Sequence, residues 1–187
     1  MPYRICAGLI AALLGAAALA ACGGGGGSSS TTAGGHGAAS AAGDATVTRV
    51  VDGDTIKVST GGRAERVRLI GIDTPESVKP NTPVQCFAEE ASARTKALLP
   101  PGTAVRLVRD AEARDKYKRL LAYVYRSNDG LFVNLALARD GYAASLTIPP
   151  NVAHVDDFVR AVRDARTANR GLWGRCGGPH EALPSHA

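Results

Sequence analysis

The chain has 187 residues, of which 45% are hydrophobic and 5% aromatic, and its formal net charge is +5. This length allows one domain with a substantial core and leaves little room for a second. The modest excess of basic residues suits a polyanionic partner, although many surface proteins are basic for other reasons.

The N-terminal segment is typical of an export signal. Arg4 precedes an uncharged apolar stretch over residues 7–21, which is too short for a comfortable transmembrane helix. The stretch ends in Leu-Ala-Ala-Cys, the pattern of a bacterial lipobox, so we expect a signal peptide over 1–21 and lipidation of Cys22. An ordinary secretory signal is the alternative. Both readings place the mature protein outside the cytoplasm, and the lipid would anchor it to the cell envelope.

The segment after Cys22 is rich in Gly and Ser and has no hydrophobic periodicity. We therefore predict a flexible tether over 22–43, a folded domain over 44–176 and a disordered tail over 177–187. His180 in that tail is expected to be solvated.

Two cysteines remain beyond the signal and the lipid site, Cys86 and Cys176. In an oxidising compartment one remaining pair indicates one disulfide, and two free thiols are the alternative. No CxxC pattern or neighbouring histidine indicates a zinc site at either cysteine.

The predicted elements begin with strands. Alternating residues over 45–60 predict two strands that turn at Asp-Gly or Gly-Gly, and 65–73 predicts a third. A helix over 86–99 follows, then strands over 103–110 and 120–127 separated by a charged loop, and a short helix over 131–141. The last element, over 154–171, is an amphipathic helix whose apolar face comprises Val155, Phe158, Val159 and Val162. Five short strands with a helix after the third predict an α+β fold, a Greek-key barrel of the OB type.

Four acids lie near two strand ends. Asp52 and Asp54 are one residue apart in VVDGDTIKV, and Asp73 and Glu76 begin the loop after the third strand. Asp-Gly alone is more often a solvated turn. If the two strand ends converge, however, the four carboxylates would repel one another without a cation. Hard oxygen donors suit Ca²⁺ or Mg²⁺ and not Zn²⁺.

Basic residues accompany these acids. Arg68 precedes the second acid pair by a few residues, and RDKYKR over 114–119 adds further cations. A metal ion with paired arginines can neutralise the charge of a phosphodiester during attack by water, which a carboxylate orients or deprotonates.

Three motifs, VDGDT, RLIGIDTPE and RDKYKR followed by LAYVY, resemble the thermonuclease (staphylococcal nuclease-like) family in order and spacing over about residues 45–175. The resemblance implies a five-stranded OB barrel with three helices. It also implies a monomeric, Ca²⁺-dependent endonuclease that hydrolyses single- and double-stranded DNA and RNA and leaves 3′-phosphates.

The resemblance also assigns roles to residues. It implies one Ca²⁺ ion, held by the carboxylates of Asp54 and Asp73 and the backbone carbonyl of Thr74, with Asp52 acting through water. It further implies that Glu76 is the general base, and that the phosphate and substrate contacts come from Arg68, Arg119, Lys116 and Tyr117. Packing of Tyr117 on the barrel is an equal alternative.

Two departures from the family pattern bear on the loops. Lys118 stands where the family usually has glycine, which could shift the loop that aims Arg119. Thr147 and Ile148 stand where tyrosines often help to hold the nucleotide. The alternative functions are an OB-type nucleic-acid-binding module without catalysis and a sugar-binding surface protein. The first is disfavoured because the full catalytic set is present.

Overall fold

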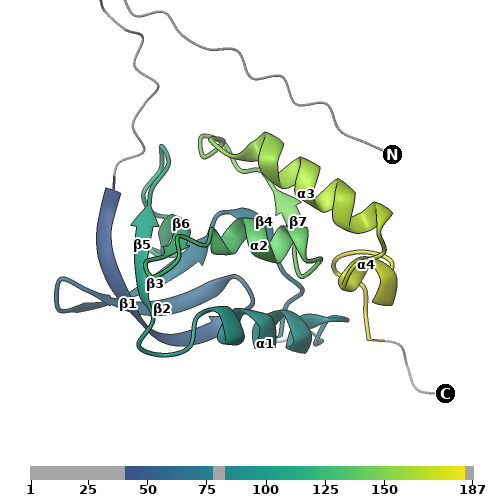
Figure 1. Ribbon diagram of the computed structural model, residues 1–187, viewed down its shortest axis with the longest axis horizontal. Helices are drawn as coiled ribbons and strands as arrows, with labels where there is room; N and C mark the ends of the chain where they lie inside the picture. Colours follow the sequence, from purple (N-terminus) through teal and green to yellow (C-terminus); the bar gives the residue numbers. More distant parts are fainter. Residues whose placement is uncertain (1–40, 78–82, 184–187) are drawn as a thin grey trace, which may run out of the picture. The chain divides into compact units, whose positions relative to one another are not determined.

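The computed structural model describes residues 41–77 and 83–183. Five strands close into a barrel in the order β1-β2-β3-β6-β5 (Figure 1). They are β1 (Ala41–Asp52), β2 (Thr55–Thr60), β3 (Arg63–Leu69), β5 (Ala104–Val108) and β6 (Leu120–Arg126). Neighbouring strands are antiparallel except β3 and β6, which run parallel. The predicted OB-type barrel is confirmed.

The predicted third strand is in fact two strands. After β3 the chain turns at Gly71 into β4 (Gly71–Asp73), which leaves the barrel and pairs with β7 (Ala144–Leu146). Gly71 has φ +83°, and a Cβ atom there would lie 2.1 Å from Cε2 of Phe158. A side chain fits neither the backbone conformation nor the space, so glycine allows the chain to change direction here. This change carries Asp73 toward the turn that follows β1.

Four helices lie within the described residues: α1 (Ala88–Leu98), α2 (Val133–Arg139), α3 (Val155–Thr167) and the short α4 (Leu172–Arg175). The three longer ones correspond to the predicted helices, and none of the four is long and apolar enough to cross a membrane. In Figure 1, α2 lies between the barrel and α3. The predicted apolar face of α3 was partly wrong: Phe158 is buried, but Val159 is 51% exposed. Ala161 and Ala165 lie on the covered side instead.

The core contains aliphatic side chains from every barrel strand, including Val47, Ile56, Leu69, Leu107 and Val124, each 1% exposed or less. The polar side chain of Asn134 in α2 is also fully buried. Its Oδ1 accepts the Val124 amide at 2.9 Å, and its Nδ2 donates to the Ile70 carbonyl at 2.9 Å. Both ends of the amide are satisfied, so Asn134 joins α2 to β6 and to the link between β3 and β4.

The C-terminal segment is tied to the start of α1. Cys86 and Cys176 form a disulfide across a sequence separation of 90. The Cys86 amide donates to the Glu181 carbonyl at 2.8 Å, and Gln85 and Ala182 form a β-bridge. Residues 177–183 therefore lie against the domain, which differs from the expected disordered tail. The predicted signal peptide, lipidated Cys22 and most of the tether lie outside the described residues.

Candidate active site

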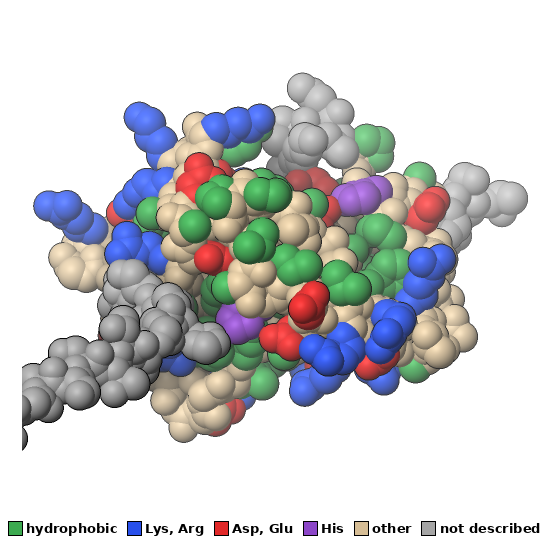
Figure 2. Space-filling model, turned by 90° about the horizontal axis from the view of Figure 1, so that it is seen from above, with side chains coloured by type: hydrophobic (Ala, Val, Ile, Leu, Met, Phe, Trp, Pro, Cys, Tyr) green, Lys and Arg blue, Asp and Glu red, His purple; other side chains and the backbone are tan. Residues whose placement is uncertain are grey.

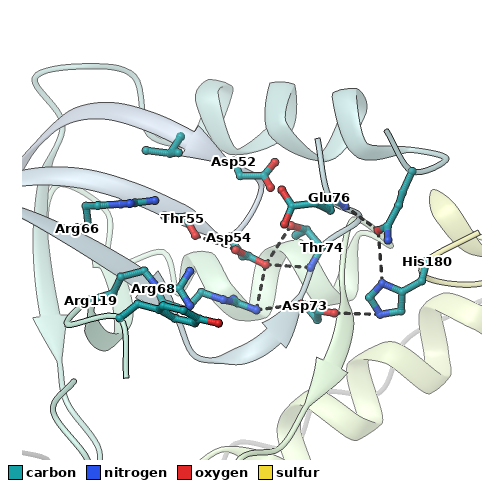
Figure 3. Close-up of a pocket in the computed structure, with 13 residues that line it drawn as sticks. Asp52, Asp54, Thr55, Arg66, Arg68, Asp73, Thr74, Glu76, Arg119 and His180 are labelled. Atoms are coloured by element: carbon teal, nitrogen blue, oxygen red, sulfur yellow. Dashed lines mark hydrogen bonds and ion pairs between the residues drawn. The ribbon is translucent and has the colours of Figure 1, made fainter. Parts of the chain in front are cut away.

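Several parts of the chain meet around a cavity of about 600 Å³ (Figure 3). They are the turn between β1 and β2, the strand β3, the end of β4 with the segment after it, the loop before β6, and the residues on either side of the disulfide, Gln85 and His180. The strand pairing of the barrel brings the turn between β1 and β2 next to the end of β3, since Thr55 at the start of β2 lies opposite Arg68. The residues that line the cavity are Val51, Asp52, Asp54, Thr55, Arg66, Arg68, Asp73, Thr74, Glu76, Gln85, Tyr117, Arg119 and His180. This list contains every predicted catalytic and metal-binding residue; of the predicted substrate contacts, Tyr117 is included and Lys116 is not.

The Asp-Gly turn holds Asp54 in place from several sides. Asp54 Oδ1 accepts the Thr55 hydroxyl at 3.0 Å, and Oδ2 accepts both the amide and the hydroxyl of Thr74 at 3.2 Å. The Thr95 hydroxyl of α1 donates to the Gly53 carbonyl at 2.6 Å. A Cβ atom on Gly53 would lie 2.6 Å from Thr74 Oγ1, so glycine permits this close approach. The Asp52-Gly53-Asp54 stretch is thus a turn, and the carboxylates of both aspartates line the cavity.

Arg68 joins the two acid-bearing segments. Its Nη2 lies 3.1 Å from Asp54 Oδ2 and 2.9 Å from Asp73 Oδ1, while Nη1 donates to the Leu69 carbonyl at 2.7 Å. The Arg68 side chain is only 12% exposed. Several fixed contacts therefore hold the planar guanidinium at the wall of the cavity, as binding of a phosphate requires.

Two carboxyl groups in the cavity are harder to ionise than usual. Burial raises the pKa of Asp52, and the hydrogen-bonding contact with Glu76 raises it further, although the Ser77 hydroxyl donates to Asp52 Oδ1 at 2.6 Å. Burial also raises the pKa of Asp73, more than the neighbouring Arg68 lowers it. These groups would gain from a cation that compensates their negative charge.

The chemistry of the donors fits a hard cation. Asp52, Asp54 and Asp73 offer only carboxylate oxygens, and Thr74 adds a hydroxyl and a carbonyl, a set that suits Ca²⁺ or Mg²⁺. Among the described residues, however, no three acidic, histidine or cysteine side chains are already grouped as a metal site. Arg68 is bound to Asp54 and Asp73 in this arrangement, so its contacts would rearrange when a cation binds.

Arg119 is aimed by Asp115. Asp115 Oδ2 accepts from Arg119 Nε at 2.6 Å, and its Oδ1 accepts the amides of Tyr117 and Arg119 at 2.9 Å each. Lys118 takes φ +64°, the left-handed region that favours the family's glycine. Its side chain is exposed, and the turn closes around it through a Lys118 amide to Asp115 carbonyl bond of 2.9 Å. With lysine at position 118, the Asp115 contacts hold Arg119 at the cavity.

Tyr117 is presented to solvent. Its side chain is 68% exposed, so it does not pack into the barrel, and the cations of Lys116 and Arg119 lie 5.1 and 5.4 Å from its ring centre. Together with Arg68 and Arg119 it also lines a second cavity of about 380 Å³. Ile148 and Leu146 are part of that wall, so aliphatic side chains stand near the position where the family often has tyrosine.

Sequence reasoning missed two residues of this site. His180 Nε2 lies 3.1 Å from Asp73 Oδ2, and Nδ1 lies 3.4 Å from Gln85 Oε1 (Figure 3). The side-chain oxygen Oε1 of Gln85 in turn accepts the backbone amide of Glu76 at 2.7 Å, and the backbone amide of Gln85 donates to the Glu76 carbonyl at 3.1 Å. The cysteine pair could have indicated them, because Gln85 precedes Cys86 and His180 follows Cys176 by four residues.

The closed barrel and the cavity with its acids and arginines define a class of OB-type phosphodiesterases. The family model described as staphylococcal nuclease homologue matches residues 66–175. The chain is 45% identical over 129 residues to a thermonuclease of Staphylococcus intermedius, across 69% of this chain and 75% of that protein. It is 41% identical over 127 residues to a thermonuclease of Staphylococcus hyicus, across 68% of this chain and 73% of that protein.

A further relative is the SPbeta prophage-derived endonuclease YokF of Bacillus subtilis (strain 168), which is 41% identical over 135 residues. The match covers 72% of this chain but only 45% of that protein, so this chain spans less than half of YokF. The chain belongs to the staphylococcal nuclease homologue family. It is accordingly a nuclease, an enzyme that hydrolyses phosphodiester bonds.

Proposed function

We propose that the protein is an exported, Ca²⁺-dependent endonuclease that cleaves DNA and RNA and leaves 3′-phosphates. The observation that carries the proposal is the convergence of Arg68, Glu76 and Arg119 with three aspartates on one cavity. A binding module that had lost catalysis would not need all of these groups in one place.

In this proposal the carboxylates of Asp54 and Asp73 and the Thr74 carbonyl hold Ca²⁺, and Asp52 acts through a water molecule. The bound cation would neutralise charge on the phosphate and favour ionised carboxylates around it. Burial raises the pKa of both Asp52 and Asp73, and a cation bound beside them would favour their ionised forms, which supports this assignment.

The chain's own residues carry the remaining steps. Arg68 and Arg119 bind the non-bridging oxygens of the scissile phosphate and stabilise the charge that builds on them during attack. Glu76 takes a proton from the attacking water, whose oxygen bonds to phosphorus as the bond to the 5′ oxygen breaks, and the 5′ oxygen takes a proton from solvent to leave as a hydroxyl. The Gln85 contacts hold the Glu76 backbone on both sides, which orients the base.

The second cavity could hold a nucleoside of the substrate. It adjoins Arg68 and Arg119, and apolar side chains including Leu69, Leu146 and Ile148 line it. A base beside these groups would leave its phosphate next to both arginines. The base would contact the aliphatic side chains and stack on the exposed Tyr117 ring. Stacking on an aromatic ring tolerates any base, so this cavity would accept nucleosides without sequence preference.

The test is cleavage of a 20-nucleotide single-stranded DNA by the purified protein, with Ca²⁺ and then with EGTA. Glu76→Gln is the catalytic variant, and Glu90→Gln, on the exposed surface of α1, is the matched control. We expect cleavage that needs Ca²⁺ and falls by about 10²–10⁴-fold in Glu76→Gln alone. Tight binding without cleavage by the wild type in Ca²⁺ would instead favour the binding module.

Export and anchoring form a separate part of the proposal. The support is the apolar segment over 7–21 and the lipobox pattern that ends at Cys22. Cells that express the protein should incorporate labelled fatty acid into it, and Cys22→Ser should abolish the label. Retention of the protein in the cytoplasm would contradict the proposed location.

A further inference from the structure

Three basic side chains form a row across the outer face of the barrel. Arg49 of β1 lies directly opposite Lys57 of β2, and Lys57 lies directly opposite Arg66 of β3. Their chain neighbours Val50, Ile56 and Val67 are all buried, so alternation along the strands places the three cations on the outside. We call Arg49, Lys57 and Arg66 the basic row.

The positive charges of the basic row are not neutralised by acids within the described part of the chain. Like charges directly opposite one another destabilise a pair of strands, and here two successive pairs are like-charged. None of the three cations forms an ion pair with an acid of residues 41–77 or 83–183.

Two exposed arginines of α3, by contrast, are paired with acids. Arg160 lies 3.1 Å from Asp157, and Arg163 lies 3.3 Å from Asp164. In Figure 2 basic and acidic side chains are intermixed toward the lower right, where α3 runs. The folded chain therefore leaves the three cations of the basic row, unlike Arg160 and Arg163, available to an external polyanion.

The basic row is continuous with the active site. Arg66 lines the 600 Å³ cavity together with Arg68 (Figure 3). The pair Thr55–Arg68 lies two residues along the strands from the pair Lys57–Arg66. Two residues of a strand advance about 6.6 Å, so successive phosphates of an extended nucleic-acid strand could follow from Arg68 to the row.

We propose that the basic row binds the backbone phosphates of a single nucleic-acid strand on one side of the scissile phosphate. The proposal deepens the proposed function, on which it rests for the position of cleavage. A single strand is the occupant because an extended backbone can follow the row into the cavity. Contacts to phosphates alone carry no base sequence, so the row contributes affinity without sequence preference.

The first experiment measures binding without cleavage. Fluorescein-labelled dT20 is titrated with the purified protein in EDTA at several salt concentrations, and anisotropy gives Kd. The test variant carries R49Q, K57Q and R66Q. The control carries R139Q, R160Q and R163Q, which remove the same charge from exposed arginines elsewhere. Circular dichroism and thermal melting check the fold, and single substitutions replace the triple variant if it does not fold.

For three phosphate contacts, the slope of log affinity against log salt should fall by about 2 for a single strand. Affinity should fall about 100-fold at 0.1 M salt, since the two lines converge near 1 M. The control should keep the wild-type slope. The test variant should also melt no lower than the wild type, because repulsion between opposite strands is removed. Equal losses in the two triple variants, or an unchanged slope in the first, would overturn the proposal.

A second measurement separates the row from the catalytic chemistry. In Ca²⁺, a variant with R49Q and K57Q alone, which leaves the cavity-lining Arg66 in place, should show a raised KM on dT20 and an unchanged kcat/KM on a dinucleotide, which is too short to reach these two cations. Loss on the dinucleotide as well would place Arg49 and Lys57 in the catalytic site and overturn the proposal. If the wild type cleaves neither substrate, the proposed function fails, and the binding measurement in EDTA still decides the role of the row.

Discussion

Removal of the Cys86–Cys176 disulfide tests how the C-terminal segment is held near the active site. The change is the double substitution Cys86→Ala and Cys176→Ala, which leaves no free thiol at either position. The disulfide restrains the unfolded chain, and it also brings residues 177–183 against Gln85 and Cys86. The variant should therefore lose global stability, and the C-terminal segment should detach more readily than the rest of the domain.

The magnitude follows from the length of the closed loop. For the sequence separation of 90, the chain-entropy relation gives about 4.6 kcal/mol at 25 °C. A domain of this size is expected to have a total stability of about 5–15 kcal/mol, so the loss would be a large part of it. The local effect should appear at one bond, the Cys86 amide to Glu181 carbonyl contact of 2.8 Å.

Urea unfolding of wild type and variant gives the difference in free energy by linear extrapolation. Native-state hydrogen exchange then reports the amide of residue 86, which should lose protection, whereas the Val124 amide, bonded to buried Asn134, should keep its relative protection. A variant with unchanged stability would refute the entropic reasoning. A variant whose residue 86 amide stays fully protected would refute the idea that the disulfide holds the C-terminal segment in place.

Three other changes test the site. Lys118→Gly should stabilise the domain by about 1 kcal/mol in urea unfolding, because glycine relieves the positive φ of +64°; a destabilised variant would contradict this. Gly53→Ala should cost about 1–3 kcal/mol and weaken Ca²⁺ binding in calorimetry, since the new Cβ would lie 2.6 Å from Thr74 Oγ1; unchanged affinity would count against it. Burial raises the pKa of Asp52 and Asp73 in the folded protein above the values of the unfolded chain. Without Ca²⁺, the resulting contribution to folding stability is fully present below the pKa values of the unfolded chain and is lost as pH rises through the pKa values of the folded protein. Asp52→Asn should then melt higher than the wild type at pH 7 without Ca²⁺, with no difference in acid; a lower melting temperature at pH 7 would refute it.

Much of the site could be read from short motifs. Asp52, Asp54, Arg68, Asp73 and Glu76 stand in local patterns whose residue types already imply a hard cation and a phosphate. The five barrel strands could be predicted as well, because alternation with period two and the Gly and Pro breaks between strands are local properties of the chain.

Other features depend on contacts between distant segments. The division of the predicted third strand at Gly71 follows from the close approach of Phe158, 87 residues further along, and no local pattern signals it. The buried face of α3 was misjudged at Val159 because periodicity alone does not say which stripe of a helix meets its neighbours.

The sequence by itself determined the barrel, the acids and arginines of the site and the cysteine pair, because local periodicity and residue chemistry express them. Only the tertiary structure decided that His180 reaches Asp73, since that contact depends on where the disulfide places the C-terminal segment. It also decided that Arg49, Lys57 and Arg66 form one row, because strand register, which sets cross-strand neighbours, is a property of the folded sheet.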